Sequence, residues 1–206
     1  MSGTLLQDAL PELLPPRGYV SPGEVRSPGD VTGAEPDSAG ELVSRAVAEA
    51  LAERHGAALA LLDDAGAAAG GDASARLLVT LNRAQALLET GDLATAEDEA
   101  AAARRLARRE KQDRWVALAG LCAALVHLAR GRRGDARSRL GEAVRLFARS
   151  GDALRQVQCH YLLGEIAWTG DDPIRAGAHY RDALAIARPA GEQAWIELLT
   201  LKFEHR

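Results

Sequence analysis

Several residue types are scarce in this chain, and their scarcity excludes several classes of protein. Of the 206 residues only two are cysteines, Cys122 and Cys159, which is too few for a disulfide framework or a cysteine-rich zinc site. No apolar run approaches the roughly 18 residues of a membrane-spanning helix. The N-terminus has neither the basic region nor the long apolar region of a secretory signal. We therefore expect a cytoplasmic protein.

The sequence motifs of common catalytic sites are missing as well. The chain has no glycine-rich loop followed by lysine, no H-E-x-x-H and no G-x-S-x-G. Its histidines are scattered along the sequence, as His55, His127, His160, His179 and His205. We therefore expect no catalytic residues, no metal site and no cofactor. An enzyme with an unrecognised site is the least favoured alternative.

Lysine is rare, and the charge is unevenly distributed. Only two of the 25 basic residues are lysines, and residues 104–155 contain 14 basic and 5 acidic side chains in a chain of net charge −4. This segment could bind an anion such as nucleic acid, or it could be a solvated face whose arginines pair with neighbouring acids. We favour the second interpretation, because no aromatic side chains that could stack on bases are interleaved with the arginines. The candidate anion-binding residues are Arg104, Arg105, Arg108, Arg109, Arg130, Arg132 and Arg133.

Small residues, in contrast, are abundant and recur at a spacing of 40 residues. A fixed period of this length is typical of stacked repeat proteins, which commonly bind other proteins along a concave surface. The three clearest registers are Ala84, Ala124 and Gly164; Ala96, Ala136 and Ala176; and Ala103, Ala143 and Ala183.

The period divides the chain into a leader and a helical region. Residues 1–39 contain six of the eight prolines, which predicts a flexible leader with a short apolar segment at 4–14. From residue 40 onward we expect helix pairs, with turns and caps at Gly91-Asp92, at Gly131 with Gly134-Asp135, and at Gly170 to Pro173. The expected helices span about 40–54, 56–69, 73–90, 93–109, 113–130, 133–149, 153–169, 172–189 and 191–205.

These registers resemble the tetratricopeptide repeat over residues 40–206. That pattern has a small residue in the first helix, another twelve later, a large residue four beyond it and an alanine three further on. The matching sets are Ala84, Ala96, Ala100 and Ala103; Ala124, Ala136, Leu140 and Ala143; Gly164, Ala176, Tyr180 and Ala183; and, more weakly, Ala46, Ala58, Leu62 and Ala65. The period of 40 exceeds the usual repeat of about 34 residues and is similar to a longer variant found in bacterial regulators.

The resemblance implies an all-α fold, a right-handed solenoid of about four antiparallel helix pairs plus a terminal helix. It also implies a non-enzymatic role: binding a peptide or helix of another protein in a bacterial regulatory or signalling system. A sensor fragment of a larger signalling protein and a nucleic-acid-binding regulator are the alternatives.

In this family the first helix of each pair lines the concave groove, which here would be largely apolar. The same side chains could instead be ordinary core between helices. The groove positions implied by the resemblance are Leu78, Leu81, Gln85, Leu88, Leu118, Leu121, Leu125, Leu128, Gln158, Tyr161, Glu165 and Trp168.

The leader offers one occupant for such a groove. Its apolar residues between Leu5 and Leu14 recur at helical spacing but have nothing of their own to cover them. We therefore expect that the N-terminal segment can plug the groove of its own chain or of a second copy in a homodimer, and that a partner protein or peptide competes with it.

Overall fold

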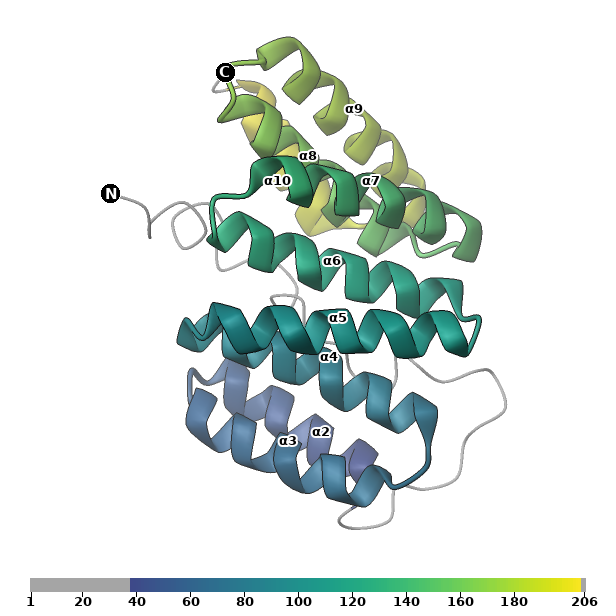
Figure 1. Ribbon diagram of the computed structural model, residues 1–206. Helices are drawn as coiled ribbons and strands as arrows, with labels where there is room; N and C mark the ends of the chain where they lie inside the picture. Colours follow the sequence, from purple (N-terminus) through teal and green to yellow (C-terminus); the bar gives the residue numbers. More distant parts are fainter. Residues whose placement is uncertain (1–37, 205–206) are drawn as a thin grey trace. The chain divides into compact units, whose positions relative to one another are not determined.

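The computed structural model describes residues 38–204, and all the regular secondary structure among these residues is helical. The predicted leader lies outside the described residues except for Ser38 and Ala39, and so does the predicted plug. All the expected helices are present, with ends that differ from the prediction by three residues or fewer (Figure 1). The helices are α2 (Ala39–Leu51), α3 (His55–Ala69), α4 (Ala73–Thr90), α5 (Leu93–Arg109), α6 (Asp113–Ala129), α7 (Arg133–Ser150), α8 (Ala153–Trp168), α9 (Pro173–Ala190) and α10 (Gln193–Glu204). No helix in this range is long and apolar enough to cross a membrane.

The described residues divide into two compact units, 38–126 and 127–204. In the first unit α2 packs on α3, α3 on α4 and α4 on α5, and α2 also contacts α4. In the second unit α7 packs on α8, α8 on α9 and α9 on α10. Consecutive helices therefore pack against each other from α2 to α5 and from α7 to α10.

The repeat period is visible in the backbone as well as in the sequence. The turn that follows the first helix of a pair contains a residue of positive φ at Gly91 (84°), Gly131 (72°) and Asp171 (57°). The turn after the second helix contains another at Lys111 (54°), Gly151 (72°) and Gly191 (72°). Both series advance by 40 residues, so the same turn recurs even where glycine is replaced by aspartate or lysine.

Aspartate caps begin several helices, as predicted, but two turns differ from the prediction. The Asp92 and Asp172 carboxylates accept hydrogen bonds from the backbone N–H groups of Thr95 and Arg175 at 3.2 and 2.9 Å. Asp135, in contrast, lies inside the first turn of α7, which begins at Arg133 without a side-chain cap. At the end of α8 the left-handed residue is Asp171 rather than Gly170, because α8 ends at Trp168 and the turn lies one residue later than predicted.

The small residues of the repeat are buried. All nine members of the three registers are buried, and eight of them, the alanines, are 1% exposed or less. In the third repeat Gly164 faces the ring of Tyr180: a Cβ at Gly164 would lie 2.4 Å from Cε1. Gly164 thus allows α8 and α9 to approach closely.

Candidate functional site

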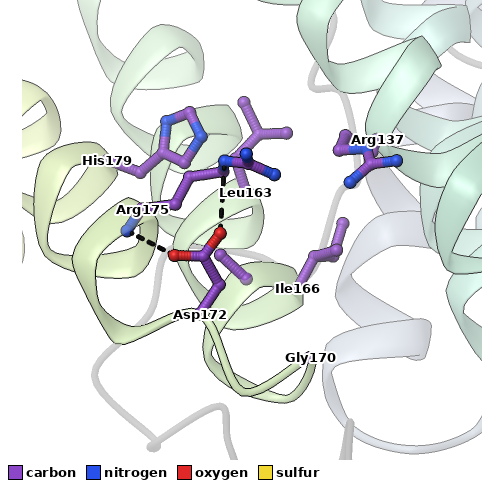
Figure 2. Close-up of a pocket in the computed structure, with 8 residues that line it drawn as sticks. Arg137, Leu163, Ile166, Gly170, Asp172, Arg175 and His179 are labelled. Atoms are coloured by element: carbon purple, nitrogen blue, oxygen red, sulfur yellow. Dashed lines mark hydrogen bonds and ion pairs between the residues drawn. The ribbon is translucent and has the colours of Figure 1, made fainter.

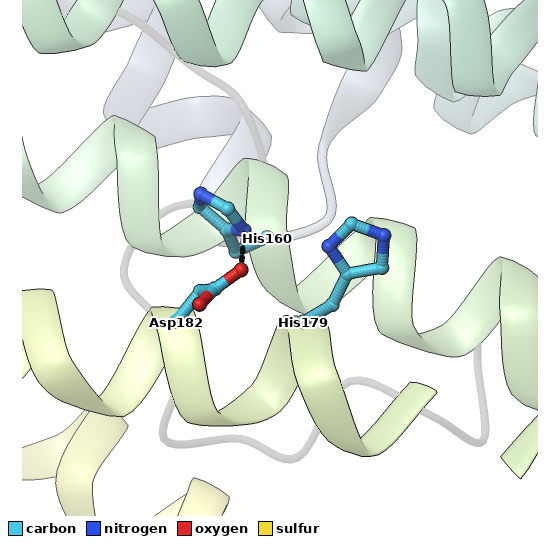
Figure 3. Close-up of side chains that lie close together, drawn as sticks. All are labelled: His160, His179 and Asp182. Carbon is cyan, nitrogen blue, oxygen red and sulfur yellow. Dashed lines mark ion pairs between the residues drawn. The ribbon is translucent and has the colours of Figure 1, made fainter. Parts of the chain in front are cut away.

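Three side chains of chemical interest meet between α8 and α9. His160 belongs to α8, and His179 and Asp182 lie about one turn apart on α9 (Figure 3). One nitrogen from each imidazole and one Asp182 oxygen lie within 4.8 Å of one another. His160 Nδ1 is 3.7 Å from Asp182 Oδ2, and the two imidazole centroids are 5.7 Å apart. These residue types can relay protons or hold a divalent metal ion.

Burial sets the charge of both histidines. Desolvation lowers the pKa of His160 below 6.5, and the nearby Asp182 carboxylate opposes this shift only in part. The pKa of His179 is lowered for the same main reason, with the Arg175 guanidinium adding to the effect. Both imidazoles are therefore mainly neutral at pH 7, and a neutral imidazole is the form that ligates a metal.

A shallow pocket lies on the side of His179 that faces the turn between α8 and α9. Figure 2 shows Arg137 of α7 on one side and Arg175 of α9 on the other, above an apolar floor that includes Leu163 and Ile166. The Arg175 guanidinium is held by Asp172, with Nε 3.4 Å from the carboxylate. The pocket therefore combines two cationic groups, one already paired, with an apolar base.

The predicted groove residues divide by their burial. Glu165, Leu88, Leu128 and Gln158 are half-buried, and Trp168 is 37% exposed. The twelve residues are divided between the two units, so the groove remains a prediction, with core packing as its alternative. The buried members are Leu78, Leu81, Gln85, Leu118, Leu121, Leu125 and Tyr161.

The polar and aromatic groove residues of the second unit contact other residues of the chain. The Tyr161 ring packs edge-on against Trp195 of α10, at a centroid distance of 5.4 Å. The Glu165 carboxylate accepts a hydrogen bond from the Tyr180 hydroxyl at 2.5 Å and one from Lys202 Nζ at 3.0 Å. The place beside the Glu165 carboxylate that a basic group of a ligand could take is therefore already occupied by Lys202 of α10.

The predicted anion-binding arginines fall in both units. Arg104, Arg105, Arg108 and Arg109 belong to the first unit, and Arg130, Arg132 and Arg133 belong to the second. Six of them have an interaction within the chain, for example the contact of Arg109 with Glu110 at 3.4 Å and the hydrogen bond that Arg133 donates to the Thr169 carbonyl.

Sequence reasoning missed the meeting of His160 with His179 and Asp182, as well as the pocket arginines. The repeat register contained a signal, because it aligns the three positions with Thr80, Glu99 and Ala102 in the first repeat and with Gly120, Arg139 and Glu142 in the second. Histidine at both imidazole positions occurs in the third repeat alone. The register does not show, however, that these three positions face each other across the helix pair.

Comparison with known proteins adds no relative: neither a protein-family model nor a curated protein matches this chain.

Proposed function

We propose that this chain is a repeat protein of the tetratricopeptide type that binds a peptide or helix of another protein in a bacterial regulatory or signalling system. In this proposal the helices form a right-handed solenoid of antiparallel pairs, and the scaffold has a binding role rather than a catalytic one.

The observation that carries the proposal is that the 40-residue period occurs in two independent properties. It occurs in the buried small residues and again in the left-handed residues of the turns. A chain that repeats both the buried small positions and the turn is expected to build the same helix pair several times, which is the defining feature of a stacked repeat scaffold.

Trp168 is the best candidate for an anchor in the partner interface. It is a large apolar side chain, 37% exposed, at the end of α8 on the helix that supplies the predicted groove positions of the third repeat. Tryptophan is enriched among the residues that dominate binding energy, since it combines a large apolar area with a polar tip.

Nucleic acid is less well supported as the partner. Six of the seven candidate arginines already interact with residues of the chain, so a phosphate would have to compete with these contacts. This favours a solvated, internally paired arginine face.

The test is to select peptides from a displayed library against the full chain. The affinity of the selected peptides is then measured for the parent chain and for the Trp168→Ala and Ile174→Ala variants. Ile174 is the matched control, because it is an exposed apolar residue, 84% accessible, outside the predicted groove. Truncation of an interface anchor costs about 2 kcal/mol or more, so we expect Trp168→Ala to weaken binding by at least about tenfold and Ile174→Ala to leave it unchanged. Failure to select any peptide, or equal binding by both variants, would contradict the proposal.

A further inference from the structure

We propose that His160, His179 and Asp182 form a binding site for a divalent transition-metal ion of the zinc type, which links α8 to α9. The inference concerns a different part of the molecule from the predicted groove and does not depend on the proposed peptide binding. It departs from the expectation, drawn from the sequence, that the chain has no metal site.

The geometry of the three side chains is close to that of a metal site. Zinc binds histidine nitrogen and carboxylate oxygen at about 2.0–2.2 Å, so neighbouring ligand atoms of a tetrahedral site lie roughly 3.3 Å apart. Here His160 Nδ1 and Asp182 Oδ2 are already 3.7 Å apart, and all three ligand atoms lie within 4.8 Å. Small rotations of the side chains would therefore bring them around one ion.

Two buried nitrogen atoms in this cluster support a bound ion. His160 Nδ1 and His179 Nδ1 are both buried, and neither has a hydrogen-bond partner in the part of the chain that the structure describes. Buried polar atoms are nearly always satisfied by protein, water or an ion. A bound metal ion would satisfy these imidazoles.

The repeat also indicates that packing does not require this cluster. The equivalent residues of the first repeat are Thr80, Glu99 and Ala102, and those of the second are Gly120, Arg139 and Glu142. The α4–α5 pair of the first repeat therefore packs without paired histidines. The histidines are a special feature of the third repeat.

The ligand types select the class of metal. Two imidazoles with a single carboxylate suit zinc and similar transition metals, whereas calcium and magnesium require mostly oxygen ligands. Three protein ligands leave a fourth position for water, and Asp182, whose side chain is 59% exposed, lies on the solvent side. The charge of Arg175 acts against a cation, but its guanidinium is partly neutralised by Asp172 at 3.4 Å.

The test is a calorimetric titration of the untagged, chelator-treated full chain with Zn²⁺, with Mg²⁺ as the comparison ion. We expect about one zinc ion per chain and no comparable heat with Mg²⁺. Loss of even an outer-shell partner costs about 10–100-fold in metal affinity, so Asp182→Asn and His179→Ala should each weaken zinc binding by at least about tenfold. His55→Ala is the matched control, because it removes one half-buried histidine from the other unit, and it should bind zinc like the parent.

Two further measurements keep the result decisive. Asp182 is exposed, so Asp182→Asn should fold even if a histidine variant does not, and circular dichroism checks this. Zinc should raise the melting temperature of the parent and of His55→Ala by more than that of Asp182→Asn. Absence of zinc binding by the parent, or parent-like affinity in Asp182→Asn, would overturn the proposal.

Discussion

At the residue scale, Gly164 sets how closely α8 and α9 approach. An added Cβ would lie 2.4, 2.7 and 2.9 Å from three carbons of the Tyr180 ring. The first and second repeats have the pairs Ala84 with Ala100 and Ala124 with Leu140 at these positions. The third repeat therefore combines the smallest residue with the largest one, since the ring occupies the space that the alanine Cβ would need.

We predict that Gly164→Ala destabilises the protein. Overpacking a well-filled crossing costs about 1–3 kcal/mol, and the Tyr180 ring has little freedom to move because its hydroxyl donates to Glu165 at 2.5 Å. Urea unfolding measures the change. The control is the double variant Gly164→Ala with Tyr180→Leu, which reproduces the Ala124 and Leu140 pair of the second repeat. The double variant should lose less stability than the sum of the losses measured for Gly164→Ala and Tyr180→Leu separately. Parent-like stability of Gly164→Ala would contradict the prediction.

A second residue-scale prediction concerns pH. Because burial lowers the pKa of His160 and of His179 below 6.5 in the folded chain, the unfolded chain binds more protons as the pH falls through 6.5. The contribution of these two histidines to stability is thus fully present above this pH and is lost progressively below it. Chemical unfolding of the chelator-treated protein between about pH 7.5 and pH 5.5 measures this slope.

The matched comparison is the double variant His160→Gln with His179→Gln. It should have a flatter stability profile over the same range, since it lacks both titrating groups. An unchanged slope would show that other groups cause the pH dependence.

At the scale of the elements, the backbone conformation of the turns is repeated more closely than their amino-acid sequence. The left-handed position after the second helix of a pair holds Lys111 in one repeat and glycine in the next two, Gly151 and Gly191. A residue with a Cβ is strained in this conformation by about 1–2 kcal/mol, whereas glycine adopts it freely. The packing of the helix pairs therefore imposes the turn, and Lys111 adopts the left-handed conformation despite its cost.

We predict opposite effects from exchanging these residues. Gly151→Ala should destabilise the chain by about 1 kcal/mol, because its φ of 72° is unfavourable for alanine. Lys111→Gly should stabilise it by less than about 1 kcal/mol, since relief of strain is partly offset by the entropy of glycine in the unfolded chain. Nothing lies within 4 Å of a Cβ added at Gly151, so a steric clash does not complicate the measurement. Thermal unfolding of both variants checks the signs, and a loss of stability in Lys111→Gly would contradict the argument.

At the scale of the whole molecule, the charge distribution determines how strongly the chain attracts an anionic partner. Residues 104–155 carry 14 basic and 5 acidic side chains, but the chain as a whole has a net charge of −4. Most of the candidate arginines interact within the chain. Attraction to a polyanion is therefore local and opposed by the remaining charge.

We accordingly predict weak nucleic-acid binding that falls steeply with salt. Binding of a labelled single strand and of a duplex, measured by fluorescence anisotropy, should be lost at physiological ionic strength, because phosphate contacts are released by competing cations. Arg105→Ala should change little, since one arginine contributes about one phosphate contact at most. Sub-micromolar binding that persists at about 0.15 M salt would instead favour a nucleic-acid-binding regulator.

The sequence by itself determined the helices, most of the turns and the buried small positions. These features depend on local physics: helical spacing of apolar residues, aspartate at helix starts and glycine in left-handed turns. Asp72, Asp92, Asp152 and Asp172 cap helices because each carboxylate reaches backbone N–H groups only two or three residues away. The all-helical class of the described residues follows from such short-range signals.

Only the tertiary structure decided which polar side chains meet. Lys202 reaches Glu165 across 37 residues of sequence, and His160 meets His179 and Asp182 across a helix crossing. It also decided that Tyr161 is buried while Trp168 is exposed, although both fall on the predicted groove face of α8. The physical reason is that such meetings depend on the rotation and crossing angle of packed helices, which side-chain packing sets and a periodic pattern along the chain does not specify.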